Sequence, residues 1–324
     1  MKTRAEGPSG PCAQGSGTLS TNIDRVREAL ALVEGKGGAF ARARSALRIG
    51  LLGRGIGASL TPAMHEAEGR RLGLVYRYDL IDFDRLGLGD ADLGAMLDAV
   101  RSAGYCGVNV TYPFKQAVIP LLDALSGEAE AIGAVNTVVF GPDGTVGHNT
   151  DCYGFAQSLR QGLGVVPVAH VVQFGAGGAG AAVAQALAEL GALTLDIVDV
   201  DHNRAEALAR QVASANGTLT RGMTPDTFVD LVDIASGIVN ATPVGMEKVP
   251  GVPFDPGLLK PHQWVADIIY FPRETDLIRA ARAAGCRVLP GGSMAVYQAV
   301  RAFKLFSGVE PDAMEMAKTF AVHA

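Results

Sequence analysis

The segment Ala169-His170-Val171-Val172-Gln173-Phe174-Gly175-Ala176-Gly177-Gly178-Ala179-Gly180 decides the fold class of this chain. An apolar run of strand length leads into glycines spaced G-x-G-x-x-G, and a helical pattern follows over residues 178–190. Such glycines let the backbone approach a pyrophosphate, whose charge then faces the N-terminus of the helix. The context favours a dinucleotide site over a tight turn without a ligand, and its predicted residues are Gly175, Ala176, Gly177, Gly178 and Ala179.

Strands and helices alternate beyond this turn. Apolar runs predict strands at residues 193–198, 238–240, 264–268 and 287–289. Helical spacing lies between them, at residues 204–216 and 280–285. This alternation is typical of an α/β doubly wound parallel sheet of the Rossmann type, and we expect the dinucleotide-binding domain to span residues 151–293.

A smaller α/β unit precedes the dinucleotide-binding domain. Strands are predicted at residues 47–52, 74–80, 107–110 and 135–140, and helices at residues 92–103 and 116–125. Thr61 followed by Pro62 is typical of a helix N-cap with proline at the first helical position. We expect a substrate-binding domain over residues 46–150, completed by C-terminal helices within residues 294–324.

Composition excludes several classes of protein. The chain has 324 residues, which favours two domains, and its 48% hydrophobic and 19% charged content is that of a soluble globular protein. A net charge of −5 gives no basic footprint for nucleic acid, and no apolar run approaches the roughly 18 residues that span a bilayer. The scattered cysteines include no metal-binding pattern, so we expect no metal, reduced thiols and a cytoplasmic location.

Residues 1–45 are expected to form a flexible tail and an extra helix. The first 20 residues are rich in Gly, Ser and Pro and lack the apolar segment of a secretory signal. Helical spacing over residues 23–33 predicts the extra helix.

The acidic residue after the second strand of the dinucleotide-binding domain bears on the choice of cofactor. Asp199 follows Gly175 by 24 residues, where a carboxylate accepts hydrogen bonds from ribose hydroxyls. A 2′-phosphate at about 4 Å would be disfavoured by about 4 kcal/mol per like charge before screening. NAD is therefore predicted over NADP. Arg204 leaves an alternative open, because an arginine can hold a 2′-phosphate, although an exposed position in the next helix is the simpler interpretation.

Two short segments carry the candidate chemistry. Lys115 ends the segment Asn109-Val110-Thr111-Tyr112-Pro113-Phe114-Lys115, and Asp151 lies in Asn149-Thr150-Asp151-Cys152-Tyr153-Gly154. A titratable couple beside a cofactor fold is what removal of a proton and a hydride from a secondary alcohol requires. An ordinary surface ion pair is the alternative.

A third segment offers hydroxyl groups. Ser59 and Thr61 lie at i, i+2 on a glycine-rich turn, where they can hold a small carboxylate, or Thr61 can simply cap the following helix. The nearby glycines at 53–57 lack the spacing of a dinucleotide loop, and His65 is interpreted as structural.

Eight ordered motifs together resemble the shikimate dehydrogenase family, and most closely its quinate/shikimate dehydrogenase branch. They lie at residues 59–62, 109–115, 133–137, 149–154, 175–180, 240–246, 267–270 and 294–299. The resemblance implies that Lys115 and Asp151 are the catalytic couple. It also implies a substrate site that includes Ser59, Thr61, Thr111, Lys115, Asn136, Asp151, Tyr270 and Gln298. Asn240, Ala241 and Thr242 would line the cofactor cleft, with Met294 near the nicotinamide.

Three positions depart from the common shikimate branch of that family. Thr61 replaces a serine, which resembles enzymes that also accept quinate. Asp199-Val200-Asp201 replaces Asn-Arg-Thr and so removes the arginine that meets the NADP phosphate. Ser293 stands where many members have glycine.

The activity implied is the reversible, NAD-dependent oxidation of the C3 hydroxyl of quinate or shikimate to the 3-dehydro compound. The alternatives are an NADP-dependent biosynthetic shikimate dehydrogenase, an aminoshikimate-type dehydrogenase, and a non-catalytic ligand sensor on the same fold. The expected partner is a small cyclitol acid, with no nucleic acid or membrane, and the chain is expected to be a monomer or a homodimer. The sequence leaves open whether Lys115 or Asp151 takes the proton.

Overall fold

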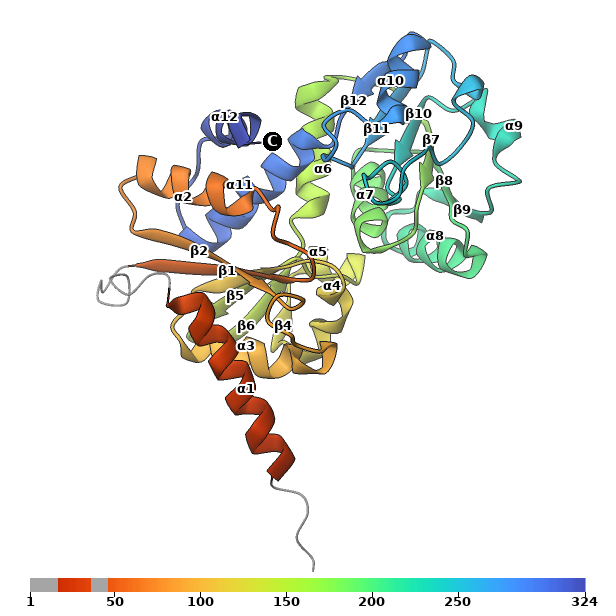
Figure 1. The fold of residues 1–324 in the computed structure, drawn as a ribbon. Coiled ribbons are helices and arrows are strands. Elements are labelled where there is room, and N and C mark those ends of the chain that lie inside the picture. The colour runs from red at the N-terminus through yellow and green to blue at the C-terminus, as the bar shows by residue number, and fades with distance from the viewer. Residues whose placement is uncertain (1–16, 36–45, 324) are drawn as a thin grey trace, which may run out of the picture.

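The structure, a computed structural model, describes residues 17–35 and 46–323, with only the backbone described at 17–22 and 216. Figure 1 shows two lobes, each built around one six-stranded sheet. Helices α6 (Asp151–Gly162) and α11 (Gly292–Ser307) lie side by side between the lobes. The tail predicted for the first residues of the chain lies outside the described residues.

The C-terminal sheet is parallel throughout, which confirms the predicted Rossmann fold. Its strand order is β12-β11-β10-β7-β8-β9. The strands are β7 (His170–Phe174), β8 (Thr194–Val198), β9 (Leu219–Met223), β10 (Gly237–Asn240), β11 (Trp264–Asp267) and β12 (Arg287–Leu289). Strand order reverses between β7 and β10, the place where open α/β sheets bind ligands at the carboxyl ends of their strands.

The helices of this lobe are α7 (Gly178–Glu189), α8 (His202–Asn216), α9 (Val229–Val232) and α10 (Asp276–Ala283). The sequence analysis missed β9, α9 and α6, and it identified only the last part of α10. The α10 start is fixed by Thr275, whose side-chain oxygen accepts a hydrogen bond from the backbone N–H of Ile278.

The N-terminal sheet is mixed, with strand order β2-β1-β3-β5-β6-β4. Its strands are β1 (Leu47–Gly53), β2 (Tyr76–Asp82), β3 (Gly107–Val110), β4 (Ala124–Leu125), β5 (Thr137–Gly141) and β6 (Gly144–His148). Strands β1, β2 and β3 pair in parallel, whereas β5 is antiparallel to both β3 and β6.

Two helix predictions in this lobe are wrong. A continuous helix over 116–125 is replaced by α4 (Phe114–Ala117) and a 3-10 turn at Ile119–Leu121, because Pro120 cannot donate a backbone hydrogen bond inside a helix. Helix α2 (Thr61–Arg71) begins at Thr61, with Leu60 as its N-cap and without a side-chain cap in the described structure. Thr61 is therefore not the predicted N-cap.

The remaining helices are α1 (Gly17–Glu34), α3 (Leu93–Ser102), α5 (Gly127–Ile132) and α12 (Ala313–His323), and a 3-10 turn at Asp90–Asp92 precedes α3. The predicted extra helix is α1, and it packs Val26, Ala29 and Leu30 into the core of the N-terminal lobe. Within the described parts of the chain, no helix is long and apolar enough to cross a membrane.

Helix α11 contributes to both lobes. Phe303 and Phe306 pack against Ile49 of the N-terminal sheet, whereas Met294 joins the core formed by α6 and α7. Each fully buried aromatic side chain of this kind contributes about 1.5–3 kcal/mol of transfer free energy. A Cβ at Gly154 of α6 would lie 2.9 Å from the backbone oxygen of Met294, so α6 and α11 can approach this closely only with glycine there. The start of α6 and the start of α11 are thereby held together.

Candidate active site

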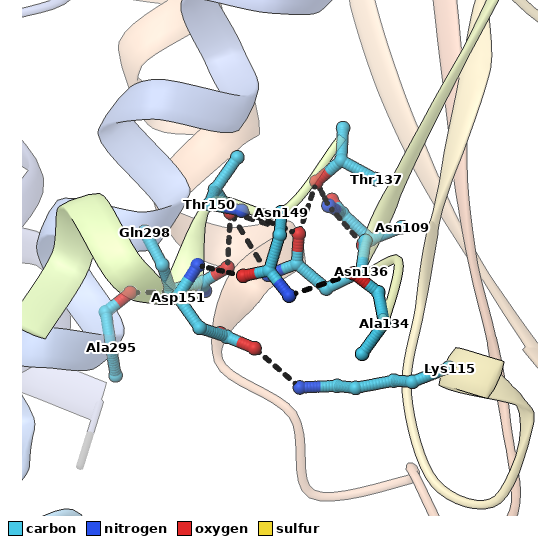
Figure 2. A network of polar contacts seen from close by, with 10 residues as sticks. All are labelled: Asn109, Lys115, Ala134, Asn136, Thr137, Asn149, Thr150, Asp151, Ala295 and Gln298. Atoms are coloured by element: carbon cyan, nitrogen blue, oxygen red, sulfur yellow. Dashed lines mark hydrogen bonds and ion pairs between the residues drawn. The ribbon is translucent and has the colours of Figure 1, made fainter. Parts of the chain in front are cut away.

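Lys115 and Asp151 meet between the two lobes. Lys115 is on α4, and Asp151 is the first residue of α6. Their Nζ and Oδ2 atoms are 2.5 Å apart, as Figure 2 shows. The two side chains are only 19% and 10% exposed, so they are not the open surface pair that was the alternative.

The glycine loop lies beside this pair. A Cβ added at Gly178, the first residue of α7, would lie 3.9 Å from Cδ of Lys115 and 4.0 Å from Cβ of Ala134. The stem of Lys115 therefore runs along the start of the helix that follows the loop. A reacting group held by the lysine would be next to whatever the loop binds.

The loop itself fits a dinucleotide. Gly175 has φ +99°, and a Cβ there would lie 2.6 Å from the oxygen of Ala241, so the loop is pressed against the carboxyl end of β10. At Gly177, the N-cap of α7, no described atom lies within 4 Å of an added Cβ, and no side-chain cap is present in the described structure. Free N–H groups and open space at a helix N-terminus are what a pyrophosphate needs.

Asp199 is fixed by three donors. Its Oδ2 accepts from the N–H of Ala176 at 2.8 Å, and its Oδ1 accepts from the N–H of Asp201 at 2.9 Å and from Nη2 of Arg204 at 2.7 Å. Burial works against ionisation, but the hydrogen bonds from Arg204, Asp201 and Ala176 outweigh it and hold the pKa of Asp199 below its ordinary value. Asp199 is therefore an anion at neutral pH and supports the glycine loop directly.

The loop after β10 is held by buried polar contacts. The amide oxygen of Asn240 accepts from the N–H of Thr242 at 3.0 Å and from its hydroxyl at 2.7 Å. The amide nitrogen of Asn240 donates to Val244 O at 2.9 Å and to Asp267 Oδ1 at 3.1 Å. Since Asn240 is fully buried, its side chain orders the loop, while Ala241 adjoins Gly175.

Ser59 and Thr61 contact each other on a fixed loop. The hydroxyl of Ser59 donates to Oγ1 of Thr61 at 3.2 Å, and the N–H of Thr61 donates to Oγ of Ser59 at 3.3 Å. Upstream, the carboxylate of Asp82 accepts from the N–H groups of Gly55 and Ile56, each at 3.1 Å. The loop also begins beside the Lys115 segment, because the N–H of Arg54 donates to Tyr112 O at 3.1 Å.

Asn136 and Gln298 adjoin the start of α6. Asn136 is buried; its Oδ1 accepts from the N–H of Thr150 at 2.8 Å, and its Nδ2 donates to Thr150 Oγ1 at 3.0 Å. Within the part of the chain that the structure describes, one amide hydrogen of Asn136 remains for another partner. Oε1 of Gln298 lies 3.5 Å from the hydroxyl of Thr150, which places α11 at the same point (Figure 2).

Tyr270 and Thr111 complete the predicted substrate residues. Tyr270 is 40% exposed, but desolvation of its hydroxyl and secondarily the charge of Asp151 raise its pKa, so the hydroxyl stays protonated and can donate. Thr111 follows β3, where its N–H donates to Leu52 O at 2.9 Å. Because the charge of Asp151 affects the pKa of Tyr270, the segment after β11 lies near the lysine–aspartate pair.

Sequence reasoning gave no role to Asn149 or Asp267, although both stand in segments that it singled out. Asn149 accepts from the N–H of Asp151 at 3.0 Å. Asp267 accepts from Asn240 and, at 2.7 Å, from the hydroxyl of Thr275. The signal available for Asn149 is its place two residues before a helix start, where asparagine side chains accept backbone N–H bonds.

Comparison with known proteins shows the family to which the chain is related. Residues 51–138 match the family model described as the shikimate dehydrogenase substrate binding domain. A shikimate dehydrogenase (NADP(+)) of Streptomyces avermitilis is 52% identical over 84% of this chain and 94% of its own length. A quinate/shikimate dehydrogenase (NAD(+)) of Corynebacterium efficiens is 49% identical over 84% of this chain and 96% of its own.

A solved structure agrees with them. Quinate dehydrogenase from Corynebacterium glutamicum, in complex with NAD, has a TM-score of 0.81 and 46% sequence identity, covering 86% of this chain and 99% of its own. The fold and these relatives make the protein an oxidoreductase that acts on a CH–OH group with NAD(P). The chain belongs to the shikimate dehydrogenase family.

Proposed function

We propose that the protein is an NAD-linked quinate/shikimate dehydrogenase, which reversibly oxidises the C3 hydroxyl of the cyclitol acid to the 3-dehydro compound. The observation that carries the proposal is the 2.5 Å contact between Lys115 Nζ and Asp151 Oδ2 beside the start of α7. The relative from Corynebacterium efficiens, named for both substrates, supports it.

The proton is handled by Lys115 and Asp151 as one coupled unit. The substrate hydroxyl hydrogen-bonds both side chains, and its proton enters the pair as the C3–H bond is broken. NAD, when bound, supplies the nicotinamide that accepts the hydride. An ammonium and a carboxylate in contact can polarise the oxygen and receive the proton without a large movement of either side chain.

Other side chains orient the substrate. The hydroxyls of Ser59 and Thr61 hold its carboxylate, and the protonated hydroxyl of Tyr270 donates to it or to a ring oxygen. The ring hydroxyls hydrogen-bond the remaining amide hydrogen of Asn136 and the side chains of Thr111 and Gln298. In this proposal residues 46–150 and 294–324 hold the substrate, and residues 151–293 hold the cofactor.

The choice of NAD rests on the ionised Asp199 at the end of β8. Its Oδ2 has one remaining acceptor position for a ribose hydroxyl. The glycine loop holds the pyrophosphate, while Ala241, Thr242 and Met294 lie toward the nicotinamide end.

An NADP-linked shikimate dehydrogenase is the second candidate, and Arg204 favours it. The guanidinium is 52% exposed whereas the Asp199 side chain is 7% exposed, so an incoming 2′-phosphate meets the positive partner first. The relative from Streptomyces avermitilis is named for NADP(+).

Initial rates for quinate and for shikimate, each with NAD and with NADP, test both candidates together. We expect turnover of both acids with kcat/KM for NAD at least about tenfold above that for NADP, a difference of about 1.4 kcal/mol. Negligible quinate oxidation with a strong preference for NADP would select the second candidate. If only an amino-substituted cyclitol acid were turned over, that acid would replace quinate and shikimate as the proposed substrate. No turnover with any of these acids would reject the proposal.

A further inference from the structure

The two members of the pair are 36 residues apart in sequence, yet a short hydrogen-bonded path joins their backbones. The carbonyl of Lys115 accepts from the N–H of Val135 at 2.8 Å. The neighbouring carbonyl of Ala134 accepts from Nδ2 of Asn149 at 2.9 Å. Oδ1 of the same Asn149 accepts from the N–H of Asp151 at 3.0 Å. One amide side chain therefore completes the path from lysine to aspartate, and Figure 2 shows its bonds to Ala134 and Asp151.

Asn149 also accepts a backbone hydrogen bond at the start of α6. The N-cap residue, Thr150, makes no side-chain capping bond in the described structure, and its own N–H is taken by Oδ1 of Asn136 at 2.8 Å. The next N–H, that of Asp151, goes to Asn149. The first turn of α6 is thus held by two asparagine side chains from outside the helix. Of the two asparagines, Asn149 is the one that binds the backbone of Asp151.

Burial makes this arrangement stiff. Asn149 is fully buried, so water does not compete for its amide. Asn149 donates to Ala134 in the segment Ala134–Val135, which is buried as well and leads into β5. The side chain therefore ties the helix that carries Asp151 to the part of the N-terminal lobe that carries Lys115.

We propose that Asn149 is a positioning residue that sets the separation of Lys115 and Asp151, a role that rests on the function proposed above. The side chain does not touch the reacting atoms. Without it, Asp151 keeps its carboxyl group and its place in sequence but loses the contact that fixes its backbone relative to Ala134. A displacement of about 1 Å at a reacting group can lower a rate about 10²-fold.

The test replaces Asn149 with alanine and with serine in the full-length protein. We expect Asn149→Ala to lower kcat for quinate or shikimate between about 10-fold and 100-fold, while KM and the dissociation constant for NAD change less than about threefold. Asn149→Ser restores an acceptor for the Asp151 N–H but no donor to Ala134, so its kcat should lie between wild type and Asn149→Ala. Should Asn149→Ala fail to fold, kcat of Asn149→Ser is compared with kcat of wild type instead.

Gln263→Ala is the matched control. Gln263 is also a fully buried amide that joins separate backbone segments, through Ala235 O at 3.2 Å and the Lys260 N–H at 2.9 Å. It immediately precedes β11, at the amino ends of the parallel strands, whereas the glycine loop follows the carboxyl end of β7. Its loss should destabilise the fold to a similar degree and leave kcat within about twofold of wild type.

The outcomes distinguish a failure of the positioning role of Asn149 from a failure of the proposed function. If Asn149→Ala and Asn149→Ser lower kcat no more than Gln263→Ala does, while Lys115→Ala abolishes turnover, the positioning role is wrong and the pair stands. If Lys115→Ala itself turns over normally, the proposed function of the pair is wrong. Loss of NAD binding in step with kcat in the Asn149 variants would also overturn the positioning role, because it would indicate a general collapse of the site.

Discussion

Nη2 of Arg204 donates to Oδ1 of Asp199 across 2.7 Å, so the two charges at the carboxyl end of β8 form a pair. The carboxylate is on the inside, supporting Ala176 of the glycine loop, and the guanidinium is on the outside. A dinucleotide that reached this point would meet a carboxylate whose charge is offset by the guanidinium of Arg204. The repulsion of a 2′-phosphate by Asp199 is therefore weaker than an unpaired carboxylate would give.

Removal of Arg204 should sharpen the preference for NAD. In Arg204→Ala the charge of Asp199 is no longer balanced, so we expect kcat/KM for NADP to fall about tenfold, or 1.4 kcal/mol, relative to that for NAD. Steady-state rates with both cofactors at low salt measure the ratio. Arg210→Ala is the control, because Arg210 lies on the same helix and pairs with Glu206 at 3.2 Å. An unchanged ratio in Arg204→Ala would show that Arg204 lies outside the reach of the 2′-phosphate.

Loss of either member of the proposed pair should stop proton transfer. We expect Lys115→Ala and Asp151→Asn each to lower kcat about 10²-fold or more, with little change in NAD affinity. Stopped-flow measurement of NADH formation, with NAD binding followed separately, distinguishes the two effects. Lys260→Ala, which removes an exposed ion pair with Asp233 at 3.1 Å, should keep wild-type turnover. Near-normal rates in Lys115→Ala would contradict the assignment.

The open space at Gly177 predicts a defect confined to the cofactor. Gly177→Ala introduces a Cβ where no described atom lies within 4 Å, so the fold accommodates it, but the methyl group occupies space beside the free N–H groups of α7. We expect the dissociation constant for NAD to rise about tenfold, a loss of about 1.4 kcal/mol, with a small change in melting temperature. Calorimetric titration with NAD measures it. Gly127→Ala has similar open space on α5 and should bind NAD normally, and equal affinity of both variants would place the pyrophosphate elsewhere.

Periodicity and glycine spacing were enough to predict the Rossmann sheet, because each of its central strands is a buried and mostly apolar run bounded by turns. They failed where a tertiary contact overrides local pattern. Strand β9 has exposed and half-buried residues and exists because it pairs with β8. Helix α6 begins at Asp151 because asparagines distant in sequence or outside the helix accept its first N–H groups.

For the site, motif resemblance named Lys115 and Asp151, and the structure brings them into contact. Spacing alone could not indicate that Arg204 turns back onto Asp199, since an arginine in the first turn of α8 can equally extend into solvent. Nor could spacing assign different hydrogen-bond partners to the two asparagines beside the start of α6. Asn136 and Asn149 look alike in sequence, and they differ in what their amide nitrogens bind: the hydroxyl of Thr150 for Asn136 and the backbone carbonyl of Ala134 for Asn149.

His65 provides a prediction about stability rather than chemistry. It is fully buried in α2, where Nδ1 pairs with the Tyr76 hydroxyl at 2.9 Å and Nε2 has no hydrogen-bond partner among the described residues. The ring packs near those of Tyr78 and Phe303, with centroids 4.9 and 5.6 Å away. Burial lowers the pKa of His65 to about 3, because it removes the water that would solvate a positive charge on the ring.

The sign of the effect follows from which state binds the proton. Unfolded His65 takes up a proton near its ordinary pKa of about 6.5, whereas the folded protein resists protonation until the pH approaches about 3. Above pH 6.5 both states are neutral and the residue leaves stability unchanged with pH. As the pH falls below 6.5 the unfolded state is favoured, by about 2 kcal/mol at pH 5. Urea unfolding of wild type and His65→Phe at about pH 7 and pH 5 isolates this effect, since the acidic groups are common to both proteins. The variant should lose about 2 kcal/mol less than wild type over that interval, and equal losses would mean that the folded protein accommodates the charged imidazole.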